Sequence, residues 1–269
     1  MKTPLVVSFS GGRSSAYMAY LLLADAKIKE QYSYIFIFAN TGKEREETLA
    51  FVNACDVMWN LKLIWVEAVV HTEHGKGTTH KIVSYLTASR NGEPFEEVFK
   101  AYGISNKPSP HCTRELKQRP ITSYLRQTLS KEDYKSYKTA LGIRFDEIRR
   151  ANKGARFIYP LFTKGVVEKH VREFWRSMPF DLNLKSYEGN CDLCWKKSAN
   201  KKMQLIRENP AVADWWMQME NKYSEGKYFF HYDNESTQSL ALRAMSGKQI
   251  EDKHHADNQE FTCTCINTF

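Results

Sequence analysis

Residues 5–24 read LVVSFSGGRSSAYMAYLLLA, and this stretch decides the fold. It opens with Leu5–Phe9, an apolar run of strand length, and ends with Ser14–Ala24, where apolar side chains recur at helical spacing. Between the two lies a turn with the adjacent glycines Gly11 and Gly12. Glycines let a ligand approach the backbone, and free amides at the start of a helix favour an anion. The stretch therefore predicts a strand, a phosphate-binding turn and a helix.

The alternation of strand and helix continues along the chain. Tyr34–Phe38 and Leu61–Val66 are further apolar runs of strand type, separated by a helical pattern over residues 44–59. Strands that alternate with helices form a parallel sheet with helical crossovers. We predict an α/β fold with a Rossmann-like parallel sheet and flanking helices over residues 1–165. A helical, cysteine-bearing C-terminal region is expected over residues 166–269.

The expected elements beyond residue 70 are less regular. His71–Thr79 is rich in Gly and Thr and indicates a loop. Its histidines His71 and His74, with His80, indicate a mobile, solvated loop rather than a metal site. Thr139–Ile143 is a further expected strand. Helices are expected at residues 81–89, 94–102, 113–129, 167–176 and 211–223.

Charge and hydropathy narrow the class of protein. The 269 residues contain no run of the roughly 18 apolar residues that a membrane span needs. The apolar N-terminal run continues into glycines and Arg13 instead of a cleavage site, so we expect a cytoplasmic protein with no membrane partner. The net charge is +8, and residues 1–100, 101–207 and 208–269 carry 0, +13 and −5. The basic central block indicates a polyanionic ligand: nucleotide phosphates, sulfate or nucleic acid.

Six cysteines in a cytosolic chain favour metal or redox chemistry over disulfides. Cys55 lies in an apolar helical segment and is expected in the core. Cys191 and Cys194 form a C-x-x-C motif, whose two thiolates can bind one ion from a single turn. A zinc ion or an iron-sulfur cluster needs four donors, and ligand softness does not choose between them. The candidate donors are Cys112, Cys191, Cys194 and one of Cys263 or Cys265, with His111 as the alternative fourth ligand.

Several motifs follow one another in a family-like order from residue 5 to about 200. They are Ser10-Gly11-Gly12-x-x-Ser15, Asn40-Thr41-Gly42 with Glu47-Thr48, HCTRELKQRP at residues 111–120, Gly142-Ile143-Arg144-x-x-Glu147-x-Arg149-Arg150, Tyr159-Pro160-Leu161 and Gly189-Asn190-Cys191-Asp192-Leu193-Cys194. The first resembles the pyrophosphate loop of the adenine-nucleotide α-hydrolase, or PP-loop, superfamily. Together, and in this order, they resemble the motifs of its phosphoadenylyl-sulfate (PAPS) reductase family.

The resemblance implies an enzyme that binds ATP or PAPS, with magnesium as a further candidate cofactor. It implies nucleotide contacts from Ser10, Gly11, Gly12, Arg13, Ser14, Ser15, Thr41, Gly42, Arg114, Lys117, Arg149 and Arg150. It implies catalytic roles for Arg144, Cys263 and Cys265. It also implies a [4Fe–4S] cluster on Cys112, Cys191, Cys194 and Cys263, with zinc as the alternative metal.

Two reactions fit the resemblance, and the sequence does not choose between them. In ATP-dependent sulfur transfer to tRNA or DNA, the glycine turn holds the departing pyrophosphate. In sulfonucleotide reduction, a tail thiolate attacks PAPS and a thioredoxin-like donor completes the cycle. Ser14 stands where the PP-loop has Asp, and the reductases' Glu-Cys-Gly-Leu-His tail is absent. These departures leave a third hypothesis, a non-catalytic nucleotide- or nucleic-acid-binding module with a structural zinc.

Overall fold

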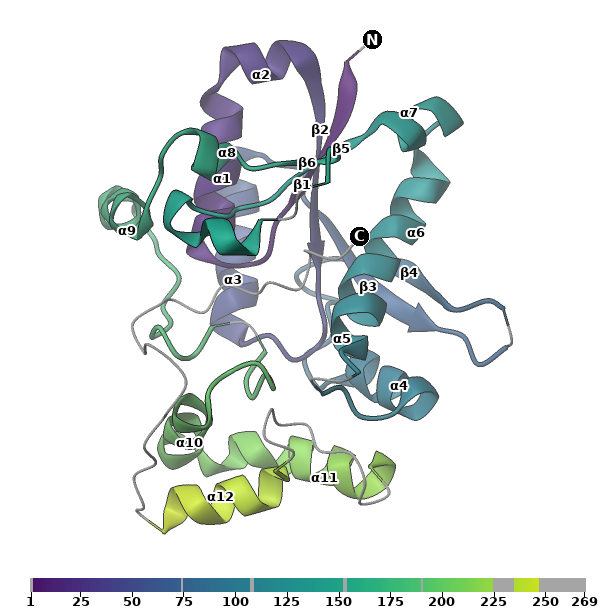
Figure 1. Ribbon diagram of the computed structural model, residues 1–269, viewed down its shortest axis with the longest axis vertical. Coiled ribbons are helices and arrows are strands. Elements are labelled where there is room, and N and C mark those ends of the chain that lie inside the picture. Colours follow the sequence, from purple (N-terminus) through teal and green to yellow (C-terminus); the bar gives the residue numbers. More distant parts are fainter. Residues whose placement is uncertain are drawn as a thin grey trace.

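A six-stranded sheet forms the centre of the structure (Figure 1). The computed structural model describes residues 2–73, 75–106, 109–151, 154–189, 191–224 and 235–246. Its strands are β1 (Thr3–Ser8), β2 (Tyr32–Ala39), β3 (Ile64–Val70), β4 (Thr78–Val83), β5 (Lys138–Ala140) and β6 (Phe157–Ile158). They lie in the order β4-β3-β2-β1-β5-β6, and all neighbours are parallel except β3 and β4. The predicted α/β fold is confirmed, but the sheet is mixed because its edge strand β4 is antiparallel.

Helices flank the sheet on both sides, and a group of helices lies beyond one end of it (Figure 1). Those of the first 136 residues are α1 (Arg13–Ala24), α2 (Ala26–Gln31), α3 (Glu46–Trp59), α4 (Glu93–Tyr102), α5 (His111–Thr113), the π-helix η1 (Arg114–Gln118), α6 (Arg119–Thr128) and α7 (Lys131–Ser136). Later ones are the 3₁₀ helix η2 (Phe145–Arg150), α8 (Pro160–Thr163), α9 (Glu168–Ser177), α10 (Ala199–Glu208), the 3₁₀ helix η3 (Pro210–Ala213), α11 (Asp214–Tyr223) and α12 (Thr237–Met245).

Alternate side chains of β1 enter two different cores. Leu5 and Val7 pack with α1 and α3 on one face of the sheet, whereas Val6 packs on the other face. There it lies in one cluster with Ile121 and Leu125 of α6. Because successive residues of a strand point to opposite faces, a strand covered by helices on both sides is apolar throughout. This explains why the first apolar run marked a central strand.

The region after residue 165 contributes to two cores. Val171 and Trp175 of α9 join the core around α1 and α3, and Trp175 Nε1 donates a 3.1 Å hydrogen bond to the carbonyl of Arg13. Helices α10, η3, α11 and α12 pack around a second core, which includes the thiols of Cys191 and Cys194. The C-terminal region is therefore helical where it is described. The predicted division at residue 165 stays a prediction.

Residues 71–89 differ from the loop and helix expected there. β3 turns back into β4, which pairs Val70 with Thr78 and Trp65 with Val83. β4 is an edge strand with exposed side chains at Lys81 and Ile82, so its sequence lacks the apolar alternation of a half-buried strand. Pairing with β3 determines its conformation, and local propensity does not.

The sheet order places a crevice between β1 and β5. From β1 the chain builds β2, β3 and β4 on one side, and it later returns to form β5 and β6 on the other. In open α/β sheets, ligands bind beyond the carboxyl ends of the strands where the strand order reverses in this way. The Ser10–Ser15 turn follows β1, and residues 142–144 follow β5, so these two segments flank that point.

Candidate functional site at the carboxyl edge of the sheet

The turn after β1 is held by its own serines. Gly11 has a φ of +79°, and a Cβ there would lie 2.7 Å from Thr48 Cγ2, so both backbone and space require glycine. Ser15 Oγ accepts hydrogen bonds from the amide of Ser10 at 3.1 Å and from its hydroxyl at 3.0 Å. The same hydroxyl donates to the Gly12 carbonyl at 2.8 Å. Gly12 is the N-cap of α1 and no side chain caps the helix, so none competes with an anion there.

The segment after β5 packs directly on this turn. A Cβ on Gly142 would lie 2.9 Å from Ser15 Cα and 3.2 Å from the carbonyl carbon of Ser14. Arg144 is fully buried, and its Nη1 donates to Ser14 Oγ at 3.2 Å. Its Nε donates to Asp146 Oδ1 at 3.0 Å, so its charge is neutralised inside the protein. Arg144 therefore fixes the turn through Ser14.

Two buried hydroxyls near the turn lack a hydrogen-bond partner among the described residues. They are Ser8 Oγ, near the end of β1, and Thr48 Oγ1, on the residue that touches Gly11. Buried hydroxyls are nearly always paired, because an unpaired one has lost its bonds to water. Thr48, on α3, adjoins the glycine turn, whereas Ser8 lies on the opposite face of β1, the face that carries Val6. Of the two hydroxyls, that of Thr48 is therefore the one placed beside the turn.

A second polar cluster lies at the carboxyl end of β2. The buried carboxylate of Glu44 accepts from the Thr41 amide at 2.8 Å and hydroxyl at 2.7 Å, and Lys117 Nζ lies 3.9 Å from it. Cys191 Sγ lies 3.5 Å from Thr41 Oγ1 and 3.9 Å from Glu44 Oε1. Burial raises the pKa of the Cys191 thiol well above its ordinary value, and the Glu44 charge acts in the same direction. The Thr-Gly motif and the C-x-x-C loop thus meet here.

A buried lysine fixes the backbone of the C-x-x-C loop. Lys197 Nζ donates to the carbonyls of Glu188, Cys191 and Asp192 at 3.1, 3.0 and 2.7 Å. Burial lowers the pKa of Lys197 to about 8. From the sequence, the pair Lys196-Lys197 indicates either a solvated helix face or a nucleic-acid contact. For Lys197 the structure shows neither, because its ammonium group is buried against these carbonyls.

The described thiols do not assemble a metal centre. No group of three His, Cys, Asp or Glu side chains in the described part of the chain is placed to hold a metal ion. Cys112, Cys191 and Cys194 share one apolar core, and Cys112 Sγ accepts a 3.4 Å hydrogen bond from Trp195 Nε1. The tail cysteines Cys263 and Cys265 lie outside the described residues. In this arrangement the residues do not fit a [4Fe–4S] cluster or zinc, and the four-donor centre stays a prediction.

Cys55 lies in the core, as expected. Its side chain is fully buried with α1 and α3, and burial raises the pKa of its thiol. It is a free cysteine of the packed interior.

The other predicted basic contacts lie apart from one another. Arg13 forms a bidentate pair with Asp181, with bonds of 2.7 and 3.0 Å. Arg150 pairs with Glu147, and Arg149 is exposed. Arg114 lies on η1 and pairs with the neighbouring Glu115.

The turn after β2 is shaped by Gly42. This residue has a φ of +80°, and its amide donates to Asn40 Oδ1 at 3.2 Å.

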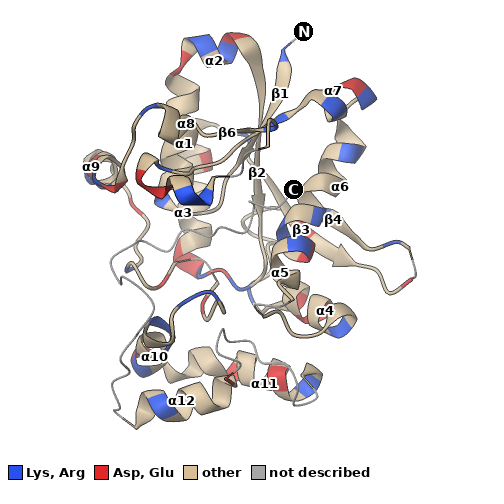
Figure 2. Ribbon diagram, in the orientation of Figure 1, with Lys and Arg blue, Asp and Glu red and all other residues tan. Residues whose placement is uncertain are grey.

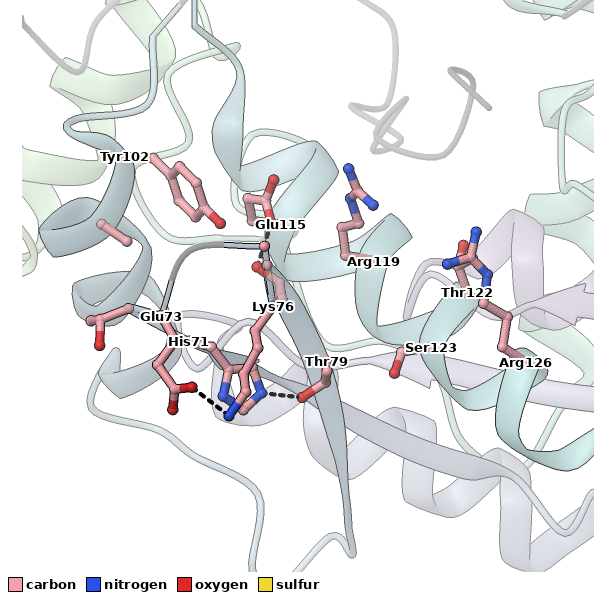
Figure 3. Close-up of a pocket in the computed structure, with 15 residues that line it drawn as sticks. His71, Glu73, Lys76, Thr79, Tyr102, Glu115, Arg119, Thr122, Ser123 and Arg126 are labelled. Carbon is pink, nitrogen blue, oxygen red and sulfur yellow. Dashed lines mark hydrogen bonds and ion pairs between the residues drawn. The ribbon is translucent and has the colours of Figure 1, made fainter.

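A cavity of about 750 Å³, which was not predicted from the sequence, lies beside the β3–β4 hairpin (Figure 3). Its walls are the hairpin, the end of α4, η1 and α6. His71 Nε2 lies 2.7 Å from Thr79 Oγ1, and His80 Nδ1 lies 2.9 Å from Ser123 Oγ, so both histidines bond to hydroxyls. His74 lies outside the described residues. The missed signal was a polar stripe on α6: Arg119, Thr122, Ser123 and Arg126, at i, i+3, i+4 and i+7.

The sequence predicts no membrane-spanning segment. Within the described ranges, no helix combines the length and the apolar character that crossing a bilayer requires.

Comparisons with known proteins give distant similarities. No family model matches the chain. The uncharacterized nin region protein ORF290 of Escherichia phage lambda is 29% identical over 199 residues, which are 73% of this chain and 67% of that protein. The uncharacterized protein MJ0066 of Methanocaldococcus jannaschii is 24% identical over 239 residues, or 84% of this chain, and the match spans only 43% of that longer protein.

One solved structure is similar across the whole chain. The U34-tRNA thiolase NcsA from Methanococcus maripaludis, with its [4Fe-4S] cluster, has 17% sequence identity and a TM-score of 0.41. The match covers 100% of this chain and 81% of the thiolase. Because this similarity is so low, we assign the α/β fold from the sheet of this protein alone, with its order β4-β3-β2-β1-β5-β6 and its glycine turn after β1.

Proposed function

We propose that this protein is an enzyme that binds an adenine nucleotide with its phosphates on the Ser10–Ser15 turn and uses it in sulfur chemistry. One observation carries the proposal: the glycine turn after β1 and the Gly142 segment after β5 pack together where the strand order reverses. A ligand in an α/β sheet binds at this point, and the uncapped start of α1 favours its anionic end.

The residues around the turn suit a nucleotide triphosphate or sulfonucleotide. The amides at the start of α1 would bind phosphate oxygens, and the buried hydroxyl of Thr48, which adjoins Gly11, would bind the polar part of the same ligand. Arg144 holds the turn in position through its hydrogen bond to Ser14 Oγ. The other residues of the PP-loop-like motif, Ser10 and Ser15, bond to each other and keep the turn rigid.

ATP-dependent sulfur transfer is the reaction that we propose. An acceptor oxygen attacks the α-phosphate of ATP and pyrophosphate leaves. A sulfur nucleophile then displaces AMP from the adenylylated acceptor. The turn would stabilise the charge that develops on the departing pyrophosphate, because helix-terminal amides act on a negative charge without reorganising. An acceptor in tRNA or DNA belongs to this proposal, as does a sulfur donor.

Sulfonucleotide reduction is the second candidate, and the environment of Ser14 favours it. Ser14 is buried and its hydroxyl accepts from Arg144, so position 14 offers no carboxylate to a magnesium ion on a triphosphate. A PAPS-reducing enzyme would instead require a nucleophilic thiol and a thioredoxin-like donor. Cys191 is buried with a raised pKa, so the tail cysteines Cys263 and Cys265 remain the proposed nucleophiles.

Nucleotide binding by a glycine variant tests the proposal. Gly12 has φ −100° and ψ 159°, which valine adopts readily, so Gly12→Val adds a side chain at the start of α1 without straining the backbone. We propose that this side chain occupies the position of a phosphate. We expect Gly12→Val to lose affinity for ATP and PAPS in isothermal titration calorimetry. Ala24→Val, at the exposed far end of α1, is the matched control and should bind as the wild type does. Full affinity in the glycine variant would place the nucleotide elsewhere.

Turnover separates the reactions. Anaerobically purified wild-type protein that releases pyrophosphate from ATP with an acceptor present supports sulfur transfer, and release of sulfite from PAPS supports reduction. Iron, sulfide and zinc analysis of the same sample tests the predicted metal centre. A protein that binds nucleotide tightly but turns over neither substrate would be a binding module instead of an enzyme.

A further inference from the structure

The cavity beside the β3–β4 hairpin has one wall made by a single face of α6. Arg119, Thr122, Ser123 and Arg126 all line it. The opposite face of α6 carries Ile121 and Leu125 into the sheet core. The polar stripe is thus turned toward the cavity because the apolar stripe is fixed against β1 and β2. Figure 3 shows the guanidinium groups of Arg119 and Arg126 extending to the same side of the helix.

In the described part of the chain, the acidic side chains nearest the cavity pair with residues other than Arg119 and Arg126. Glu115, buried in the wall, accepts a hydrogen bond from Thr78 and pairs with Arg114 at 2.5 Å. Glu73, at the hairpin, pairs with Lys76 at 2.6 Å.

Arg119 faces solvent and Arg126 contacts a tyrosine. Arg119 is exposed and forms no ion pair within the described residues, and Arg126 Nε donates to the neutral phenol of Tyr134 at 2.9 Å. Two positive charges therefore remain available to a ligand, and Figure 2 shows basic residues along α6. Hydroxyls of the cavity wall add the neutral donors that phosphate oxygens also accept.

The opposite end of the cavity holds an aromatic side chain. Tyr102, at the end of α4, is only partly exposed, and its ring stacks on His111 at a centroid distance of 5.7 Å and an interplanar angle of 29°. Nucleic-acid bases stack on such rings whatever their sequence. Charged and aromatic groups thus share one cavity.

We propose that this cavity binds a single strand of nucleic acid, with Arg119 and Arg126 on two separate phosphates. This inference rests on the proposed function, since the strand would be the acceptor that the nucleotide activates. Arg119 and Arg126 are seven residues apart, which is about 10 Å along the helix axis, so two anionic groups match them better than one. The hairpin leaves the sheet at the carboxyl end of β3, the same edge that carries the Ser10–Ser15 turn.

The test is fluorescence anisotropy with a labelled single-stranded RNA or DNA of about twelve nucleotides. The variant is Arg119→Gln with Arg126→Gln. Its matched control is Lys27→Gln with Lys29→Gln, which removes the same charge from exposed positions of α2, just before the amino end of β2. Thermal unfolding of both double variants, and the single variant Arg119→Gln, control for folding.

We expect the arginine variant to bind about tenfold more weakly at roughly 0.1 M salt, while the lysine control stays within about twofold of wild type. The slope of log affinity against log salt should fall by about 1.4, since each phosphate on a single strand contributes about 0.7. Equal binding by the arginine variant and the lysine control overturns the inference. So does displacement of the strand by AMP at equal concentration, because the cavity would then take a free nucleotide.

ATP titration of the same proteins separates this inference from the proposed function. The arginine variant should keep wild-type ATP affinity, because Arg119 and Arg126 lie outside the glycine turn. If ATP binds and the arginine variant binds the strand as tightly as the wild type does, the proposed strand site is wrong and the proposed nucleotide site is retained. If Gly12→Val also leaves ATP affinity unchanged, the proposed function fails independently.

Discussion

Replacing Gly142 by alanine tests the contact that joins the two halves of the candidate nucleotide site. An added Cβ would lie 2.9 Å from Ser15 Cα and 3.0 Å from the Ser15 nitrogen, whereas ordinary van der Waals contact begins at 3.4 Å. Both neighbours are backbone atoms in the first turn of α1, so no side chain can rotate away. The segment after β5 and the start of α1 must therefore separate by about 0.5 Å, which is roughly the shortfall in contact distance.

This displacement should reduce both stability and ligand affinity. Overpacking of this kind costs about 1–3 kcal/mol of unfolding free energy. At about 2–4 °C per kcal/mol for a chain of this size, the melting temperature should fall by roughly 2–12 °C. A shift of about 0.5 Å takes a hydrogen bond of about 2.9 Å outside its good range, so loss of part of one phosphate contact should weaken ATP binding about tenfold.

Gly103→Ala is the control for this prediction. Gly103 has a φ of +78° with a ψ of 179° and nothing within 4 Å of an added Cβ, so alanine there costs about 1–3 kcal/mol of backbone strain without any steric clash. Calorimetric melting and ATP titration should show a loss of stability comparable to that of Gly142→Ala but no loss of affinity. If Gly142→Ala behaves in the same way as Gly103→Ala, the contact between β5 and α1 does not shape the site.

Two further predictions concern buried charge and titration. Arg144→Ala empties the space of a fully buried side chain and removes its hydrogen bonds to Ser14 and Asp146, so urea denaturation should show a loss of about 3 kcal/mol, while Ser14→Ala, which removes one hydrogen bond, should lose about 1 kcal/mol. Burial lowers the pKa of His80, so the unfolded state binds its proton at a higher pH than the folded state does. The unfolding free energy should therefore fall as the pH drops below about 6.5, and fall less in His80→Gln, in denaturation curves at about pH 7.5 and 5.5.

The central strands and their helices could be predicted because their signals are local. β1 and β2 are buried on both faces in their central residues, so each run is apolar at nearly every position, with Ser8 as the exception, and the helices α1 and α3 that cover them carry one apolar face each. β4 and β6 could not be predicted in the same way. β4 pairs with β3 at the sheet edge, and β6 has only two residues, so sheet pairing determines both and propensity does not.

The same distinction between local and long-range determinants applies to the candidate site. The glycine turn was predictable because a positive φ at Gly11 and an uncapped helix start require particular residues at particular positions.

The environment of the thiols was not predictable, because it depends on contacts between distant segments. Glu44 lies 147 residues before Cys191 and raises its pKa, and Lys197 binds the carbonyls of the C-x-x-C loop. A motif specifies which donors are available, but burial and neighbouring charge decide whether they are thiols or thiolates. Burial, together with the charge of Glu44, raises the pKa of the Cys191 thiol and so favours its protonated form, whereas Lys117 acts in the opposite direction. The chemistry of the C-x-x-C loop therefore depends on the Thr41-Glu44 turn as much as on the cysteines themselves.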